Sequence, residues 1–315
     1  MDRHRTVAAA AAATATAAAL AAVLVLDGCG SSARGAAREP STAESRTLER
    51  AEQILISRCM AARGFPYAVT EGPGDGARSF PYAVDDIAWA REHGYGGAEE
   101  RAAARARGDD PNQRYFRQLS APERAAARTA LMGAAPVGLS VEAPTGMTVT
   151  ASADGCIADA QRSLYGDPAA WFRVKVVTMN LRPVREARVR EDARYTGAVA
   201  EWAVCMKAAG RPHATPDESR QAAARYGEDL PPAEADAAAA ELAVAEATCA
   251  TGTPLARVSQ TLDRAYGEEL RTRHRAEITL RWRLQNEALP RARRLTQSEH
   301  DTATETSGGS HASHA

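Results

Sequence analysis

The sequence has few aromatic residues, few cysteines and almost no net charge. Aromatic residues make up 5% of the 315 residues, five residues are cysteine, and the formal net charge at pH 7 is −1. Balanced charge creates no overall field that would attract a nucleic acid, so we expect no nucleic-acid partner. A chain of this length can hold one large domain or two smaller ones, and we expect two compact halves.

Sequence patterns of common enzymes are also missing. The chain contains no Gly-x-Ser-x-Gly nucleophile motif. His93, His213 and His274 in the body of the chain lack the spacing of a metalloprotease site. The sequence therefore predicts no catalytic residue, no metal site and no cofactor. The sequence does not decide whether the protein is an enzyme, and we favour a protein without enzymatic activity.

Two pairs of adjacent aspartates are the candidates for acid and base groups. They are Asp85-Asp86 and Asp109-Asp110, and Asp110 precedes Pro111 as a helix N-cap would. A glycosidase needs two carboxylates about 5 to 10 Å apart across a cleft. A cell-wall hydrolase or modifying enzyme that uses carboxylates is therefore the alternative function.

Five aromatic residues cluster within one loop-rich stretch of the first half. Such rings either fill the core of a small unit or form a platform for a sugar or a peptide. We favour the core. The residues are Tyr67, Phe80, Tyr82, Trp89 and Tyr95.

The N-terminus has the pattern of an export signal. Arg3 and Arg5 precede an uncharged run, which ends in Leu-Asp-Gly-Cys at Cys29. This ending resembles a bacterial lipobox, although Asp27 departs from the small or aliphatic residue usual there. We expect a signal peptide over residues 1–28 and a lipid on Cys29, which anchors the protein to the outer face of the cell membrane. The alternative is an uncleaved anchor helix, since about 20 apolar residues can span a bilayer. Both interpretations leave the body outside the cytoplasm.

Two terminal segments are polar and have no apolar periodicity. Residues 29–45 are expected to form a tether, and residues 296–315 a disordered tail. The tail histidines, His300, His311 and His314, are too sparse to predict a metal site.

One short sequence motif occurs twice in the chain. "SRCMAARGFP" at 57–66 and "AVCMKAAGRP" at 203–212 share Cys-Met, then Gly, then Pro at the same spacing. Apolar residues before each copy of the motif recur every three or four positions, which predicts an amphipathic helix. Gly is typical of a helix C-cap, and Pro prevents continuation. We therefore expect each Cys-Met to lie near the end of a helix, on or beside its buried face.

The repeat divides the body into two related helical units, over residues 46–190 and 191–295. Alternating apolar residues on both sides of "PTG" at 144–146 predict a short β-hairpin in the first unit. A helix is expected over 168–190, and one long arginine-rich helix from Pro254 to about Thr296. The expected fold class is mainly α, with one hairpin and a long C-terminal helix.

Four cysteines remain after Cys29, and four cysteines allow three pairings. An even number in an exported chain favours disulfides. The repeat favours one of these pairings, in which the cysteine of each Cys-Met helix bonds to the later cysteine of the same unit. This pairing gives the disulfides Cys59–Cys156 and Cys205–Cys249. A zinc site made of the same thiols would lack paired two-residue spacing, and thiol redox catalysis would lack Cys-x-x-Cys.

The order of these short motifs resembles uncharacterised secreted lipoproteins of actinomycetes, Streptomyces especially. The matching features run from about Leu48 to Arg294: a Cys-Met helix, "GC" before a helix ending in "LYGD", a second Cys-Met helix, and a cysteine before a helix through "RAYGEEL". The resemblance implies export, lipidation and disulfides. It implies no catalytic residue.

We therefore expect a non-enzymatic lipoprotein that binds an envelope protein or a cell-wall component. A small-ligand carrier is disfavoured, because the chain lacks the alternating strands and helices of common solute receptors. The expected partner surface is the arginine-rich face of the C-terminal helix. Its residues are Arg271, Arg273, Arg275, Arg281 and Arg283.

Overall fold

The computed structural model describes residues 37–70 and 78–308, with side chains as far as Glu299. These residues belong to one compact unit that begins at Ala37. The expected signal peptide, Cys29, His311 and His314 lie outside the described residues.

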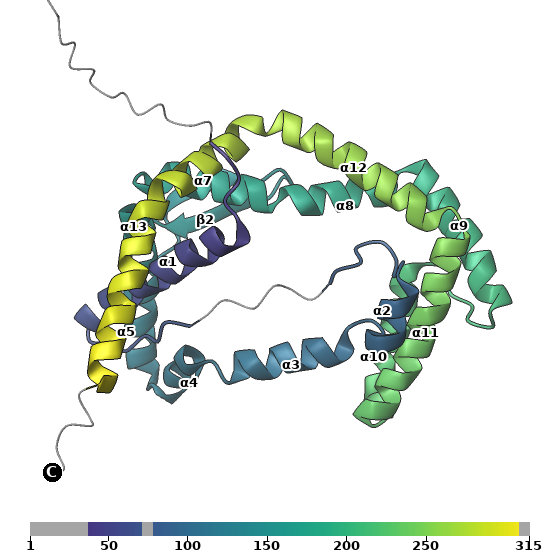
Figure 1. The fold of residues 1–315 in the computed structure, drawn as a ribbon, viewed down its shortest axis with the longest axis horizontal. Helices are drawn as coiled ribbons and strands as arrows, with labels where there is room; N and C mark the ends of the chain where they lie inside the picture. The colour runs from purple at the N-terminus through teal and green to yellow at the C-terminus, as the bar shows by residue number, and fades with distance from the viewer. Residues whose placement is uncertain (1–36, 71–77, 309–315) are drawn as a thin grey trace, which may run out of the picture. The chain divides into compact units, whose positions relative to one another are not determined.

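The protein is mainly helical with one β-hairpin, which confirms the predicted fold class (Figure 1). The helices of the first half are α1 (Thr42–Ala62), α2 (Ile87–His93), α3 (Gly97–Gly108), α4 (Pro111–Gln118), α5 (Ala121–Met132), α6 (Cys156–Tyr165), α7 (Pro168–Met179) and α8 (Leu181–Glu191). Those of the second half are α9 (Ala193–Ala208), α10 (Pro216–Asp229), α11 (Pro232–Gly252), α12 (Leu255–Arg273) and α13 (Arg275–Gly308).

The hairpin pairs β1 (Gly138–Glu142) with β2 (Thr148–Ser152) in antiparallel register. Val141 faces Val149, and the turn closes where the amide of Ala143 donates to the carbonyl of Met147 at 2.8 Å. Gly146 lies in this turn with φ +83°, a conformation that other residues rarely adopt.

The two helices that carry the repeated motif end in the same hydrogen bonds. Gly64 and Gly210 follow the helices with φ +83° and +73°. The next amide in the chain then donates to the carbonyl of Met60 in one copy and of Met206 in the other, both at 2.9 Å. This is the Schellman arrangement, which satisfies the last carbonyls of a helix. Both methionines have no exposed surface, so methionine rather than cysteine is the deeper residue of each pair.

Both predicted disulfides are present. Cys59 is bonded to Cys156 with a Cα–Cα distance of 5.6 Å, and Cys205 to Cys249 with 5.7 Å. The first joins the end of α1 to the start of α6, and the second joins α9 to α11.

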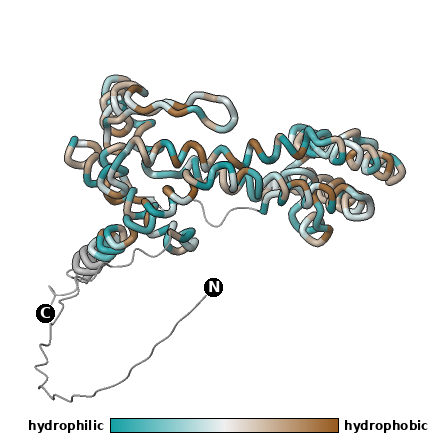
Figure 2. Tube along the Cα trace, turned by 90° about the horizontal axis from the view of Figure 1, so that it is seen from above, coloured by the Kyte–Doolittle hydropathy of each residue, from teal (hydrophilic) through white to brown (hydrophobic). Residues whose placement is uncertain are grey.

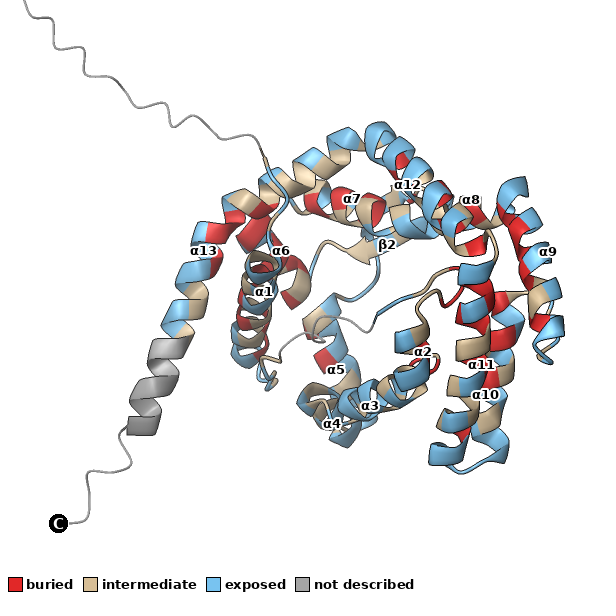
Figure 3. Ribbon diagram, turned by 45° about the vertical axis from the view of Figure 1, so that its right-hand side comes forward, coloured by how far each residue is buried: buried red, intermediate tan, exposed pale blue. Residues whose placement is uncertain are grey.

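Two large apolar clusters form the core, and each combines residues from both halves of the chain. Leu48 and Ala51 of α1 and Trp171 of α7 pack with Leu289 and Ala292 of α13. The other cluster surrounds α9, and Tyr82 and Ala83 from the first half pack there with Trp202, Met206 and Leu242. Figure 3 shows buried residues gathering around α1, α6, α7 and α13, and again around α9 and α11. The helices accordingly alternate between hydrophobic and hydrophilic residues along the trace (Figure 2).

Three helix boundaries differ from the sequence-based expectation. The run from 254 breaks at His274, where α12 packs along α8 and α13 packs along α1 and α7. The expected helix over 168–190 breaks at Asn180, whose side-chain amide donates back to the carbonyl of Val176. α13 continues to Gly308, beyond the expected start of disorder at 296. Leu295 packs on the apolar cluster and Glu299 pairs with Arg58 of α1, so the tertiary contacts of α13 extend past that point.

Candidate functional site

Two adjoining cavities that share Arg182 and Arg185 of α8 form an arginine-lined cleft. We call them the Trp282 cavity, of about 450 Å³, and the Tyr82 cavity, of about 560 Å³. Residues of α8 and α12 line both of them, because these helices lie side by side (Figure 1). The Trp282 cavity also takes residues from α13 and from the segment before α1.

Helical spacing aims the arginines of α8 toward α12. Arg182 and Arg185 are three residues apart, so both lie on the same face of the helix. Arg185 lies 2.9 Å from Asp263 of α12, close enough for an ion pair but not oriented for a hydrogen bond. Arg182 pairs with Glu186 at 2.6 Å and also donates to the hydroxyl of Ser79.

Arg185 and Arg271 converge on a glycine of α12. A Cβ atom placed on Gly267 would lie 3.4 Å from Nη1 of Arg271 and 3.7 Å from Nη1 of Arg185. Two guanidinium groups therefore approach the same point, which repulsion between like charges disfavours. The absence of a side chain on Gly267 leaves the space in which they meet.

Arg281 of α13 is a partly buried charge of the cleft, and Glu39, which lines the same cavity, acts on it from a distance. Nη1 of Arg281 donates to the hydroxyl oxygen of Thr178 at 2.6 Å. Within residues 37–70 and 78–299, no carboxylate lies within ion-pair distance of Arg281. Burial lowers the pKa of Arg281, because the charged form loses hydration.

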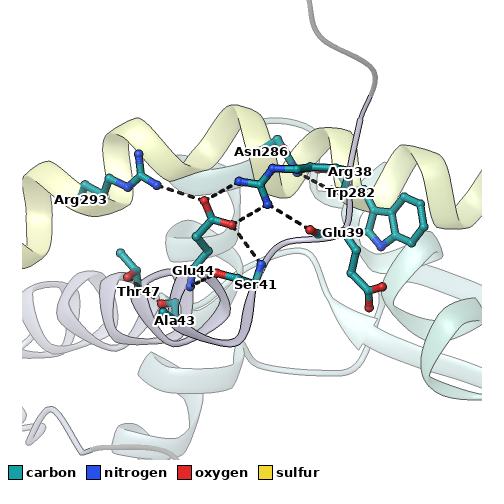
Figure 4. A network of polar contacts seen from close by, with 9 residues as sticks. All are labelled: Arg38, Glu39, Ser41, Ala43, Glu44, Thr47, Trp282, Asn286 and Arg293. Carbon is teal, nitrogen blue, oxygen red and sulfur yellow. Dashed lines mark hydrogen bonds and ion pairs between the residues drawn. The ribbon is translucent and has the colours of Figure 1, made fainter.

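A network of hydrogen bonds among Arg38, Glu44, Asn286 and Arg293 holds the segment before α1 against α13 (Figure 4). We call this network the clasp. Glu44 accepts two hydrogen bonds from Arg38, both at 2.7 Å, and a third at 3.1 Å from Arg293 of α13. The side chain of Asn286 donates to the carbonyl of Arg38 at 2.9 Å. Ser41 and Glu44 complete a capping box at the start of α1. The clasp places Glu39 and Pro40 in the wall of the Trp282 cavity.

The Tyr82 cavity uses two of the five aromatic residues singled out in the sequence, Phe80 and Tyr82. The hydroxyl of Tyr82 donates to Asp263 at 2.5 Å, and burial together with this carboxylate raises the pKa of Tyr82. Arg78 lies over the ring of Phe80 at 5.0 Å. The other three rings, those of Tyr67, Trp89 and Tyr95, pack against buried apolar clusters, as the core interpretation expects.

The aspartate pairs serve mostly as helix caps. Asp86 caps α2 through the amide of Trp89 and pairs with Arg78, and Asp110 caps α4. Asp85 accepts a hydrogen bond from Gln260 at 3.0 Å and lines the Tyr82 cavity together with Asp263. The Tyr82 cavity therefore brings two carboxylates into one hollow, as Glu142 and Glu277 do in a hollow beside the hairpin.

The expected partner arginines are divided between two surfaces. Arg271 and Arg281 line the Trp282 cavity. The other three, Arg273, Arg275 and Arg283, line a shallow hollow where α12 meets α13. The face of α13 that carries Ala288, Leu289 and Ala292 is buried in the core.

Arg182, Arg185 and Gly267 were not predicted from the sequence as site residues. An isolated glycine inside a helical pattern often marks a close approach, so Gly267 in "RAYGEEL" was the one available signal. Nothing in the local pattern connects the arginines of α8 with α12, which lies about eighty residues further along the chain.

A further hollow of the described residues is an apolar groove of about 570 Å³. The hairpin, the end of α5, α6 and α7 form its walls, and it is rimmed by Met132 and Met179. These methionines are 56% and 58% exposed. Flexible, exposed methionines are typical of adaptable binding surfaces.

Comparison with protein-family models, with curated proteins and with solved structures finds no match to this chain. In the part of the chain that the structure describes, no helix is both long and apolar enough to cross a bilayer. The same residues contain no cluster of three or more groups that could hold a metal ion. The arginine cleft, argued from its own geometry, is the candidate site.

Proposed function

We propose that this is a lipid-anchored, extracytoplasmic binding protein that takes an anionic envelope component into the arginine cleft. The single observation that carries the proposal is the convergence of Arg185 and Arg271 at Gly267, in the cavity that Arg281 also lines. Guanidinium groups gathered in a hollow suit carboxylate or phosphate ligands. The disulfides and the lipobox-like sequence at Cys29 support the location outside the cytoplasm.

The resemblance to secreted lipoproteins of actinomycetes agrees with this location. The lipid on Cys29 would hold the body at the membrane, and the bound component would be part of an envelope protein or of the cell wall. Asp263 and Glu268 near the cleft are engaged in ion pairs with Arg185 and Arg271, which favours binding over acid and base catalysis.

A cell-wall hydrolase is the second candidate, because Asp85 and Asp263 line the same cavity. Incubation of the full chain with purified peptidoglycan distinguishes the two. Released fragments that disappear in an Asp85→Asn variant would support the hydrolase, whereas peptidoglycan left intact would support a binding role.

Cross-linking in cells with the tagged full chain tests the binding function. Arg182 belongs to both cavities, so Arg182→Glu should remove the cross-linked component. Arg283→Glu is the matched control, because Arg283 is exposed on α13 outside the cleft. Capture that is equal in wild type and Arg182→Glu would overturn the assignment of the cleft.

A further inference from the structure

We propose that the Trp282 cavity binds the phosphate group of a phosphate ester, with Arg185, Arg271 and Arg281 as its ligands. This inference rests on the proposed function of the arginine cleft and names the chemistry of its ligand.

The arrangement of charges is the first argument. Arg185 and Arg271 each place Nη1 within 3.7 Å of one point above Gly267. Their acidic partners, Asp263 and Glu268, lie 2.9 Å and 2.7 Å away and occupy only part of the donor set of each arginine. A guanidinium has five N–H donors, and a tetrahedral anion with several oxygens can accept from more than one arginine at once.

Arg281 adds a partly buried charge, on which Glu39 of the same cavity wall acts only from a distance. The Thr178 hydroxyl donates to the carbonyl of Val174 at 2.7 Å, so its oxygen is the acceptor for Nη1 of Arg281. Thr178 thereby orients the guanidinium, and among residues 37–70 and 78–299 no carboxylate lies within ion-pair distance of it. A cation fixed in this way at a cavity wall is arranged for an anion from outside the chain.

The remaining wall indicates that the ligand is more than inorganic phosphate. The cavity of about 450 Å³ is also lined by Leu181, Leu270, Ile278 and Trp282. These apolar side chains suit an organic group attached to the phosphate, since small-molecule sites combine mainly apolar walls with a few polar contacts. A phosphate ester satisfies both parts of the wall.

The ester has two possible sources, a membrane phospholipid or a soluble molecule. Glu39 and Pro40 are part of the cavity wall, and seven residues separate Cys29 from Ala37. With a lipid on Cys29, these residues limit the start of the body to at most about 28 Å from the membrane surface. A phospholipid headgroup is thus within range, and the experiment separates it from a soluble ester.

The test is calorimetric titration of glycerol 3-phosphate into the purified full chain in neutral detergent micelles. Binding is expected, and Arg281→Gln should weaken it about ten- to a hundredfold, as expected for the loss of a charged hydrogen bond. Gln keeps the polar character and part of the aliphatic stem of the side chain but removes its charge. Arg283→Gln, on the same helix but outside the cavity, should leave the affinity unchanged.

A second pair of variants tests the floor of the cavity. Gly267→Ala should weaken binding, because its Cβ would lie 3.3 Å from Cδ of Arg185 and would fill the meeting point of the two arginines. Gly197→Ala in α9 is the matched control, since a Cβ there meets nothing within 4 Å. Alanine favours a helix over glycine, so neither change should unfold the protein.

Repeating the titration in micelles that contain phosphatidylglycerol identifies the source. Suppressed binding of glycerol 3-phosphate would support the phosphate site and assign it to a lipid headgroup. Unchanged binding would support the site and assign it to a soluble ester. No binding in neutral micelles, or equal weakening by Arg281→Gln and Arg283→Gln, would overturn the phosphate site even if Arg182→Glu still abolished the cross-link of the proposed function.

Discussion

The hydroxyl of Tyr95 donates a hydrogen bond of 2.7 Å to Oε2 of Glu246, a carboxylate with no exposed surface. Oε1 of the same side chain accepts from the amide of Val84 at 2.8 Å. Glu246 lies on α11, whereas Val84 and Tyr95 belong to the first half of the chain. One buried carboxylate therefore fixes the 84–95 segment to the second half. Burial raises the pKa of Glu246, because the ionised form loses its hydration.

Two replacements of Glu246 should distinguish the contribution of its hydrogen bonds to stability from the contribution of its charge. Glu246→Ala leaves the Val84 amide and the Tyr95 hydroxyl without acceptors, and should lower the free energy of unfolding by about 3 kcal/mol. Glu246→Gln retains an acceptor for the Val84 amide and should stay near wild type. Urea unfolding at neutral pH measures both. Glu241→Ala, an exposed position of α11, should change stability by less than about 0.5 kcal/mol.

The same residue should make stability depend on pH. A carboxyl whose pKa is raised by folding stabilises the native state fully below its unfolded pKa, and this contribution is lost as pH rises through the folded value. The wild-type protein should therefore lose stability over that interval, and Glu246→Gln should not. Parallel losses in the two proteins would assign the pH dependence to other groups.

The disulfides should contribute unequally. They close loops with sequence separations of 97 and 44 residues. Chain entropy gives upper values of about 5 kcal/mol for Cys59–Cys156 and about 4 kcal/mol for Cys205–Cys249. Double substitution of each pair by alanine, followed by denaturant unfolding, measures the losses. The order would be contradicted if the shorter loop proved more costly.

The equivalent methionines should respond alike to truncation. Met60 and Met206 are completely buried at the ends of α1 and α9. Met→Ala at either position removes apolar contacts and leaves a cavity, which should cost about 2 to 5 kcal/mol. Val204→Ala on α9, 71% exposed, is the control and should be nearly neutral. If Met→Ala at either position left stability unchanged, the two copies of the repeat would share the helix C-cap but not the packing of the methionine.

Features defined by neighbouring residues were predictable from the sequence. Gly64 and Gly210 end their helices because a C′ glycine with positive φ is a local requirement. The disulfides followed from the repeat, which identifies equivalent cysteines without any geometry. The order within each Cys-Met pair was not predictable, since adjacent helical positions at the edge of an apolar face have similar periodicity.

Features defined by packing between distant segments were not predictable. The break at His274 occurs without proline or glycine. It arises because α12 packs along α8, whereas α13 packs along α1. The cleft depends on that break, because it brings Arg271 and Arg281 to one cavity and leaves Arg273 and Arg283 outside. Helical spacing within a single continuous helix gives no such division.

The clasp before α1 should open in acid. Hydrogen bonds from Arg38 and the Ser41 amide lower the pKa of Glu44 to about 2. A carboxyl with a depressed pKa stabilises the folded state above its unfolded pKa, and the contribution is lost as pH falls toward that lowered value. Hydrogen exchange of the amides of 41–47 should therefore accelerate between about pH 4 and pH 2, relative to amides in α11.

Glu44→Gln should produce the same acceleration already at neutral pH, because the neutral amide no longer pairs with Arg38 and Arg293. Glu49→Gln is the matched control, an exposed position on the same helix. Because Glu39 and Pro40 line the Trp282 cavity, an opened clasp should also weaken phosphate binding. Exchange that is equally slow in wild type and Glu44→Gln would mean that α13 holds this segment through Asn286 and apolar packing alone.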